Sequence, residues 1–260
     1  MLSLRRPIFF PSVGTALPKL PLPTLQIPKL PLSRISSSSV KMAAKAVEHV
    51  VLFRVKPDAE PSKVDAMISS LNSLTTLPAV LHLTAGPISR LRSQSLDFTH
   101  LLHSRYRTKE DLAAYSAHPA HVSVVKESVL PVCDDIMAVD WEADLDGPAL
   151  PPAGAAMRVT LLKLKEGLGD GEKGEVMIAL GGIKGSFPEV EQISFGENFS
   201  PARAKGFTVG SVSIFPGKKE MEALDEKGET VEMHKEKVRG LLDSVVVVDY
   251  EILTPAVASL

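Results

Sequence analysis

The sequence repeats itself once. The segment VEHVVLFRVK at 47–56 matches MRVTLLKLK at 157–165, and VDWE at 139–142 matches VDYE at 248–251. Further matches lie between these segments in the same order, with a single one-residue slip in the offset between Gly86 and Phe98. Ordered similarity of this kind indicates two copies of one domain. We therefore assign domains to residues 47–142 and 157–251.

The segment between the copies has the composition of a linker. It reads ADLDGPALPPAGAA at 143–156 and is rich in Pro, Gly and Ala, which favour irregular connecting structure. Residues 252–260 follow the second copy as a C-terminal tail.

The N-terminal segment differs from the rest of the chain. Residues 1–47 contain no Asp or Glu, but seven Lys or Arg, seven Pro and a serine run at 36–39. Frequent proline prevents a continuous helix, and a basic, serine-rich, acid-free composition is typical of an organellar transit peptide. We predict that residues 1–46 are a disordered targeting segment. The alternative is a disordered basic arm that carries no targeting signal.

The C-terminus carries a second candidate signal. The tripeptide Ala258-Ser259-Leu260 resembles a weak peroxisomal signal of the Ser-Lys-Leu kind and lacks its basic middle residue. Together the two signals predict an organellar protein of a plant cell. The N-terminal segment favours the chloroplast, and the C-terminal tripeptide favours the peroxisome.

Composition excludes several classes of protein. The formal net charge is −2, whereas nucleic-acid-binding proteins usually carry a basic surface. The single cysteine, Cys133, cannot form an internal disulfide or a cysteine zinc cluster. Because no stretch approaches 18 apolar residues, we expect no membrane-spanning helix.

Each copy shows the same succession of elements. In the first copy, strand patterns cover 47–56, 80–86, 98–106 and 134–142. A helical apolar stripe runs from Val64 to Leu77 and ends before Pro78, while two short helices between Thr108 and Leu130 are separated at His118-Pro119. The order β-α-β-β-α-β is that of a ferredoxin-like domain.

The first strand predicts how the two copies pack. Val51 and Phe53 on one face and Val50 and Leu52 on the other are all apolar, so both faces of this strand must be covered. Helices cover one face, and the sister copy is the natural cover for the other. We therefore predict an α+β protein in which two tandem ferredoxin-like domains form an intramolecular dimeric α/β barrel.

Four segments give the chain a family resemblance. VEHVVLFRVK, FTH at 98–100, AYSAHPAH at 114–121 and VDWE resemble the stress-responsive A/B barrel (Dabb) family of plants, in its tandem two-domain form. The resemblance implies a dimeric ferredoxin-like barrel, here a pseudo-dimer within one chain. A homodimer of whole chains is left open.

The resemblance also implies two sets of functional residues, although no cofactor is required. A plant polyketide cyclase of this family, olivetolic acid cyclase, uses a Tyr and a His that match Tyr115 and His121. His49 and His100 complete the polar set, and both would line the barrel cavity if their strand faces point inward. Some family members hold Mg²⁺ on backbone carbonyls after the first helix, where weak binding is expected because no carboxylate is present. The matching positions are Leu74, Leu77, Pro78 and Val80.

The second copy lacks this polar set. Arg158, Val209, Leu224 and Thr230 stand where the first copy has His49, His100, Tyr115 and His121. The glycine-rich segment 170–185 also weakens its first helix. We therefore expect the second copy to be mainly a structural partner.

Two functions are compatible with the sequence. The first is a non-enzymatic stress-response A/B barrel protein that binds a small hydrophobic ligand. The alternative is a cofactor-free, polyketide cyclase-like enzyme that uses Tyr115 and His121 in a first-copy cavity. A histidine beside a phenol is a sensible acid–base pair. Buried polar residues more often serve packing, however, so we favour the non-enzymatic interpretation.

Overall fold

The computed structural model of the chain describes residues 44–148 and 150–252. Within the predicted targeting segment, residues 1–43 lie outside the described residues, and so does the tripeptide 258–260. Both localisation signals therefore stay predictions. The two repeats belong to one compact unit.

The first repeat has the predicted succession of elements with one additional short strand. Its helices and its long strands lie where the apolar patterns place them. The elements are β1 (Ala44–Val55), α1 (Pro61–Ser73), the 3₁₀ turn η1 (Leu74–Thr76), β2 (His82–Pro87), β3 (Arg90–Arg92), β4 (His100–Tyr106), α2 (Lys109–Ala117), α3 (Pro119–Val124), the π-helical turn η2 (Val125–Val129) and β5 (Cys133–Leu145).

The second repeat follows the same plan without a counterpart of β3. Its glycine-rich helix α4 forms because Val176 and Leu180 are buried, and this packing outweighs the low helix propensity of glycine. The elements are β6 (Ala156–Leu164), α4 (Asp170–Gly181), α5 (Ile183–Ser186), β7 (Gln192–Glu197), η3 (Pro201–Arg203), β8 (Val209–Phe215), α6 (Lys218–Glu226), α7 (Gly228–Arg239) and β9 (Leu242–Glu251).

Local sequence signals set where the short helices begin. The Thr108 side chain accepts a hydrogen bond from the backbone N–H of Asp111 at 3.2 Å, which caps the start of α2. His118 ends α2 and caps α3 through Nδ1, which accepts from the Ala120 N–H at 3.2 Å. Pro119 then occupies the first turn of α3, where its missing N–H is not needed.

The central strand extends further than its apolar pattern predicts. β1 begins at Ala44, inside the segment predicted to be disordered, and Ala44 pairs with Leu145, inside the predicted linker. Both extensions arise because β1 and β5 continue their ladder, which satisfies the backbone groups of the two segments.

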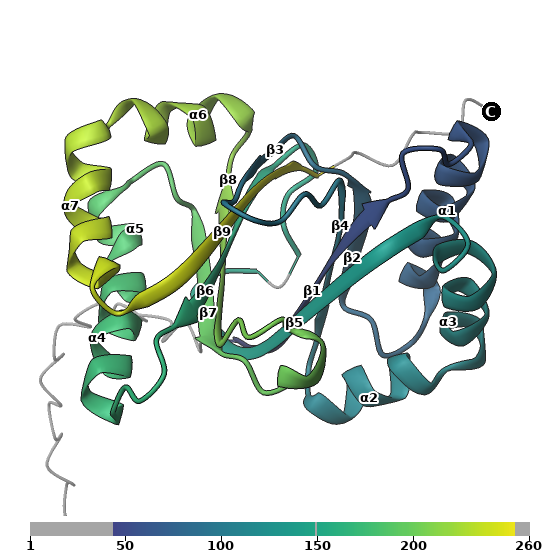
Figure 1. Ribbon diagram of the computed structural model, residues 1–260, viewed down its shortest axis with the longest axis horizontal. Coiled ribbons are helices and arrows are strands. Elements are labelled where there is room, and N and C mark those ends of the chain that lie inside the picture. The colour runs from purple at the N-terminus through teal and green to yellow at the C-terminus, as the bar shows by residue number, and fades with distance from the viewer. Residues whose placement is uncertain (1–43, 149, 253–260) are drawn as a thin grey trace, which may run out of the picture. The chain divides into compact units, whose positions relative to one another are not determined.

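The strands form two antiparallel sheets that face each other, with the helices outside (Figure 1). The first sheet has the order β2-β4-β1-β5 and the second has the order β3-β9-β6-β8-β7. β3 therefore leaves its own repeat and joins the second sheet, where Leu91 pairs with Val248. At the other edge, the Phe199 N–H donates to the Asp140 carbonyl at 3.0 Å. The repeats thus exchange contacts along both edges, as a pseudo-dimer.

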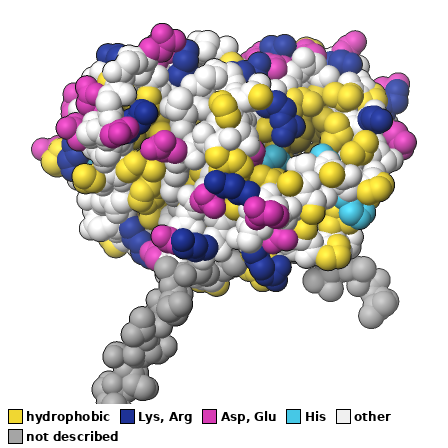
Figure 2. Space-filling view, turned by 90° about the horizontal axis from the view of Figure 1, so that it is seen from below, with side chains coloured by type: hydrophobic (Ala, Val, Ile, Leu, Met, Phe, Trp, Pro, Cys, Tyr) yellow, Lys and Arg dark blue, Asp and Glu magenta, His cyan; other side chains and the backbone are white. Residues whose placement is uncertain are grey.

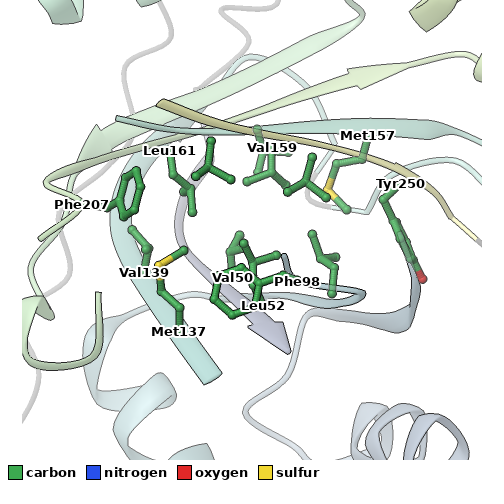
Figure 3. Packing of buried hydrophobic residues seen from close by; sticks show 14 of the residues in the cluster. Val50, Leu52, Phe98, Met137, Val139, Met157, Val159, Leu161, Phe207 and Tyr250 are labelled. Carbon is green, nitrogen blue, oxygen red and sulfur yellow. The ribbon is translucent and has the colours of Figure 1, made fainter. Parts of the chain in front are cut away.

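An apolar layer fills the space between the sheets (Figure 3). Val50 and Leu52 of β1 face Val159 and Leu161 of β6, and all four are buried. The other face of β1 is covered too, because Phe53 packs with residues of α1 and α2. This arrangement confirms the prediction, made from the apolar pattern of the first strand, that both of its faces are covered.

None of the helices in the described ranges is both long and apolar enough to cross a membrane.

Candidate functional site

The predicted polar residues lie between the first sheet and its helices. His49 has the same strand parity as Val51 and Phe53, which pack under the helices, whereas Val50 and Leu52 face the second sheet. His49 therefore does not line the barrel interior. The site lies instead between the first sheet and the helices α2 and α3.

His49 is bound to a carboxylate that the sequence analysis did not select. His49 and Asp140 are direct neighbours across the β1–β5 ladder, and His49 Nδ1 lies 2.5 Å from Asp140 Oδ1. A carboxylate only accepts hydrogen bonds, so we assign a proton to His49 Nδ1. Burial alone would raise the pKa of Asp140, but the bond to His49 and smaller contributions from Ser200 and Arg203 lower it.

Two tyrosines and a second histidine complete this cluster. The ring centroids of Tyr106 and Tyr115 lie 5.2 Å apart, and those of Tyr115 and His121 lie 4.6 Å apart. The His49 ring lies 6.4 Å from each tyrosine ring. The break at His118 matters here, because it turns the chain so that Tyr115 on α2 and His121 on α3 approach each other.

Burial favours the uncharged forms of the two tyrosines and of His121. Burial raises the pKa of Tyr115 to about 12, and burial also raises the pKa of Tyr106. Burial is the main cause that lowers the pKa of His121, despite its bond from Nδ1 to the Ser116 carbonyl at 3.0 Å. At neutral pH Tyr115 is therefore a proton donor and His121 a neutral base.

His100 does not join the cluster. It pairs with Phe53, whereas Ser104 pairs with His49, so it lies four positions along β4 from the residue opposite His49, or roughly 13 Å at the usual rise of a strand. Its Nδ1 instead contacts the Thr99 hydroxyl at 2.9 Å. Sequence reasoning missed Tyr106 and Asp140. The sequence signal that could have found them is strand alternation, which places Tyr106 on β4 and Asp140 on β5 on the same face of the sheet as His49.

The cluster itself is largely closed to solvent. Tyr115 is 2% exposed and His49 4% exposed, while His121 is half-buried. Figure 2 shows a hollow on the half of the molecule that carries α2 and α3, with hydrophobic side chains around it and histidine side chains at its edge. Within the cluster, His121 is the residue that is most open to solvent.

The four carbonyl positions predicted for Mg²⁺ fit a metal poorly. The Leu74 carbonyl accepts the Leu77 N–H at 3.1 Å, and the Leu77 carbonyl accepts the Val80 N–H at 3.0 Å. No carboxylate belongs to the set, and Mg²⁺ is usually bound through one or two carboxylates. The described residues also contain no group of three His, Cys, Asp or Glu that could hold a metal. The Mg²⁺ prediction therefore rests on the resemblance alone.

A different charged cluster occupies the equivalent place in the second repeat. Arg158 stands at the position of His49 and donates from Nε to Asp249 Oδ1 at 2.7 Å. It also donates from Nη1 to Asp225 of α6 at 2.8 Å. Arg90 and Arg92, from the transferred strand β3, reach the same two carboxylates.

This charged cluster lies at a cleft of about 970 Å³ between the second sheet and its helices. The floor is the outer face of β6, β8 and β9, and the walls come from α4 to α7. Apolar side chains from these elements line much of the space, among them Leu162, Val176, Leu180, Ile183, Phe187 and Phe215.

The cleft exists because the second repeat carries smaller side chains on its floor. Ser211 of β8 stands where the first repeat has the much larger Leu102, and Thr160 of β6 adds a hydroxyl where it has Val51. On the wall, Leu224 replaces the larger Tyr115. In the first repeat the larger residues Leu102 and Tyr115 are fully buried and fill the equivalent space. The expectation that the second repeat is mainly a structural partner did not include this cleft.

The chain has clear relatives. The family model for the stress responsive A/B barrel domain matches residues 47–143 and 157–252. One stress-response A/B barrel domain-containing protein of Arabidopsis thaliana is 50% identical over 216 residues, which cover 83% of this chain and 82% of that protein. A second Arabidopsis thaliana protein of the same description is 46% identical over 209 residues, 79% of this chain and 96% of that protein.

Among solved structures, an anthrone oxidase-like protein matches with a TM-score of 0.54 and 13% identity, over 81% of this chain and 92% of that one. At this level of identity, the likeness shows a shared fold alone.

Proposed function

The chain belongs to the stress-responsive A/B barrel domain family, and we propose that it acts as a non-enzymatic stress-response protein that binds a small, largely apolar molecule. The observation that carries this proposal is the second-repeat cleft. Its volume of about 970 Å³ falls within the range of small-molecule sites, which are concave, mostly apolar and supplied with a few polar groups.

A neutral fluorescent probe tests this proposal. We expect N-phenyl-1-naphthylamine to bind the full chain with saturable fluorescence enhancement and to raise its melting temperature, because a ligand of the native state stabilises it. The double substitution Thr160→Val and Ser211→Leu gives the cleft floor the residues of the first repeat. It should weaken probe binding about tenfold or more.

The matched control is Ser62→Leu, which makes a similar change on the exposed start of α1 and should leave binding unchanged. If the double variant folds and binds the probe as tightly as the parent chain, the cleft is not the binding site.

The first-repeat cluster favours a second candidate function, a cofactor-free cyclase-like enzyme. The specific observation is the approach of Tyr115 to His121, with ring centroids 4.6 Å apart, in surroundings that keep both groups neutral. His121 would accept the proton from a carbon between two carbonyl groups, and Tyr115 would donate a hydrogen bond to the enolate oxygen that develops.

The test is conversion of a linear poly-β-keto thioester by the full chain. Tyr115→Phe and His121→Gln should each lower the rate at least a hundredfold, the usual contribution of a positioned acid or base. The control is Leu224→Phe, which alters the equivalent position in the second repeat. A parent chain that gives no more product than buffer would reject the enzymatic function and leave the binding proposal intact.

A further inference from the structure

The charged end of the second-repeat cleft contains more positive than negative groups. Three arginines share two aspartates there. Arg158 bridges Asp225 and Asp249, and its pairs with each are 2.8 Å and 2.7 Å long. Arg92 contacts both carboxylates at 3.3 Å and 2.9 Å, while Arg90 contacts Asp225 at 3.1 Å. The cluster therefore carries one positive charge in excess.

Donor capacity remains on the two arginines of β3. A guanidinium has five N–H donors. In the contacts described, Arg90 donates from Nη1 and Arg92 from Nη1 and Nη2. The Arg90 side chain is 56% exposed and that of Arg92 is 29% exposed. A ligand at the cleft can thus reach both groups.

The surroundings of Arg92 show that the excess charge is unfavourable in the absence of an anion. Burial lowers the pKa of Arg92, and the neighbouring charge of Arg158 lowers it further, whereas the carboxylates of Asp249 and Asp225 only partly compensate. An added anion would reduce this repulsion and stabilise the charged form.

The first repeat has the same layout but a different set of charges, and there the charge of Arg203 contributes to lowering the pKa of Asp140. His49 stands in place of Arg158. At the edge of its sheet the neighbouring segment is Phe199 and Ser200, in the place where the second repeat receives Arg90 and Arg92. The group of three arginines around two carboxylates is therefore a feature of the second cleft, and it is complete only because β3 crosses from the first repeat.

We infer that the second-repeat cleft binds an amphipathic carboxylate, with its acidic head group on Arg90 and Arg92 and its apolar body along Leu162, Leu180 and Ile183. This inference rests on the proposed function and adds the chemical class of the ligand. Planar guanidinium groups bind carboxylates through two parallel hydrogen bonds, and the apolar lining of the cleft accommodates a chain or ring attached to that head group.

Two probes of equal chain length separate the head group from the apolar body. Dodecanoate and 1-dodecanol would each displace N-phenyl-1-naphthylamine from the full chain at pH 7.5. We expect dodecanoate to bind at least about tenfold more tightly than 1-dodecanol. Raising the salt concentration should narrow the difference, since partly exposed charges are screened.

Two substitutions test whether the carboxylate head group binds at Arg90 and Arg92. Arg90→Gln and Arg92→Gln should each reduce dodecanoate affinity about tenfold and leave 1-dodecanol affinity unchanged, and the unchanged alcohol binding shows that the variant is folded. Arg107→Gln, which alters an exposed arginine of the first repeat, is the matched control and should change neither affinity.

Equal affinities for acid and alcohol, or an acid affinity insensitive to Arg90 and Arg92, would overturn the head-group inference and leave the binding proposal standing. If none of the three probes binds, both proposals are wrong.

Discussion

Gly210 of β8 lies directly against the indole ring of Trp141, so closely that a Cβ atom at residue 210 would fall 2.4 Å from two ring atoms. Trp141 belongs to the first repeat and is fully buried at the interface between the sheets. The equivalent of Gly210 in the first repeat is Leu101. The position thus holds a glycine because the indole of the sister repeat occupies the volume of its side chain, so the two repeats are complementary rather than interchangeable.

This contact predicts that a larger side chain at residue 210 weakens the packing between the two repeats. Gly210→Ala should lower the free energy of unfolding by about 2 kcal/mol, because overpacking a closed core typically costs 1–3 kcal/mol. Denaturant titration followed by Trp141 fluorescence measures the change. Gly174→Ala in α4 is the control of opposite sign. Nothing lies within 4 Å of a Cβ there, and replacing glycine in a helix should add up to about 1 kcal/mol.

The interior between the sheets also holds a buried ionic group. Glu48 accepts hydrogen bonds from His103 Nε2 at 2.6 Å and from Arg105 Nε at 3.0 Å, and all three side chains are fully buried. The second repeat has Met157, Val212 and Ile214 at these positions. Glu48→Ala should destabilise the fold by about 3–5 kcal/mol, because it removes the buried carboxylate that accepts from both Arg105 and His103.

The second repeat itself supplies the control for this prediction. The triple substitution Glu48→Met, His103→Val and Arg105→Ile removes the whole group, and replacing a buried ionic group by apolar residues is often neutral or stabilising. Chemical denaturation compares the two variants. A triple variant as unstable as Glu48→Ala would contradict this account.

His82, a histidine next to this ionic group, predicts how the stability of the fold depends on pH. Burial lowers the pKa of His82 to about 3, and the nearby His103 and Arg105 charges add to the effect. Unfolded His82 binds a proton below its ordinary pKa of about 6.5, whereas the folded form does not until about 3. The unfolded state therefore binds more protons in this window. Stability is fully present above pH 6.5 and falls as the pH drops toward 3, by about 1.4 kcal/mol per unit for this residue.

His82→Gln removes this contribution and should flatten the pH dependence of the free energy of unfolding between pH 6.5 and 4. Denaturant titrations at several pH values give the slope. An unchanged slope in the variant would show that His82 is not responsible.

Asp225 offers a prediction in which stability and binding change in opposite directions. Its carboxylate, about one third exposed, is shared by Arg90, Arg92 and Arg158. Asp225→Asn should lower the melting temperature by a few degrees, and it should raise dodecanoate affinity several-fold because the arginines lose a competing anion. Calorimetry measures both quantities. Weaker dodecanoate binding in this variant would indicate that Asp225 itself contacts the ligand.

Much of the fold follows from local patterns and from the repeat. The two copies, the β-α-β-β-α-β order and the caps at Thr108 and His118 each depend on a few neighbouring residues. The proximity of Tyr115 and His121 was also foreseeable, since only a helix break separates them. The direction of His49 was not, because a strand that is apolar on both sides gives no indication of which face meets the helices.

Local sequence patterns therefore establish the domain plan and the need of β1 for cover on both faces, because periodicity and turn chemistry act over short distances. The tertiary structure decided the rest. β3 is only three residues long, Arg90–Arg92, and it becomes a strand because β9, far along the chain, offers an unpaired edge. The cleft depends on the small volumes of Ser211 and Leu224 from two separate elements, and its charge depends on arginines brought in from the other repeat. Such properties arise only when distant segments are packed together.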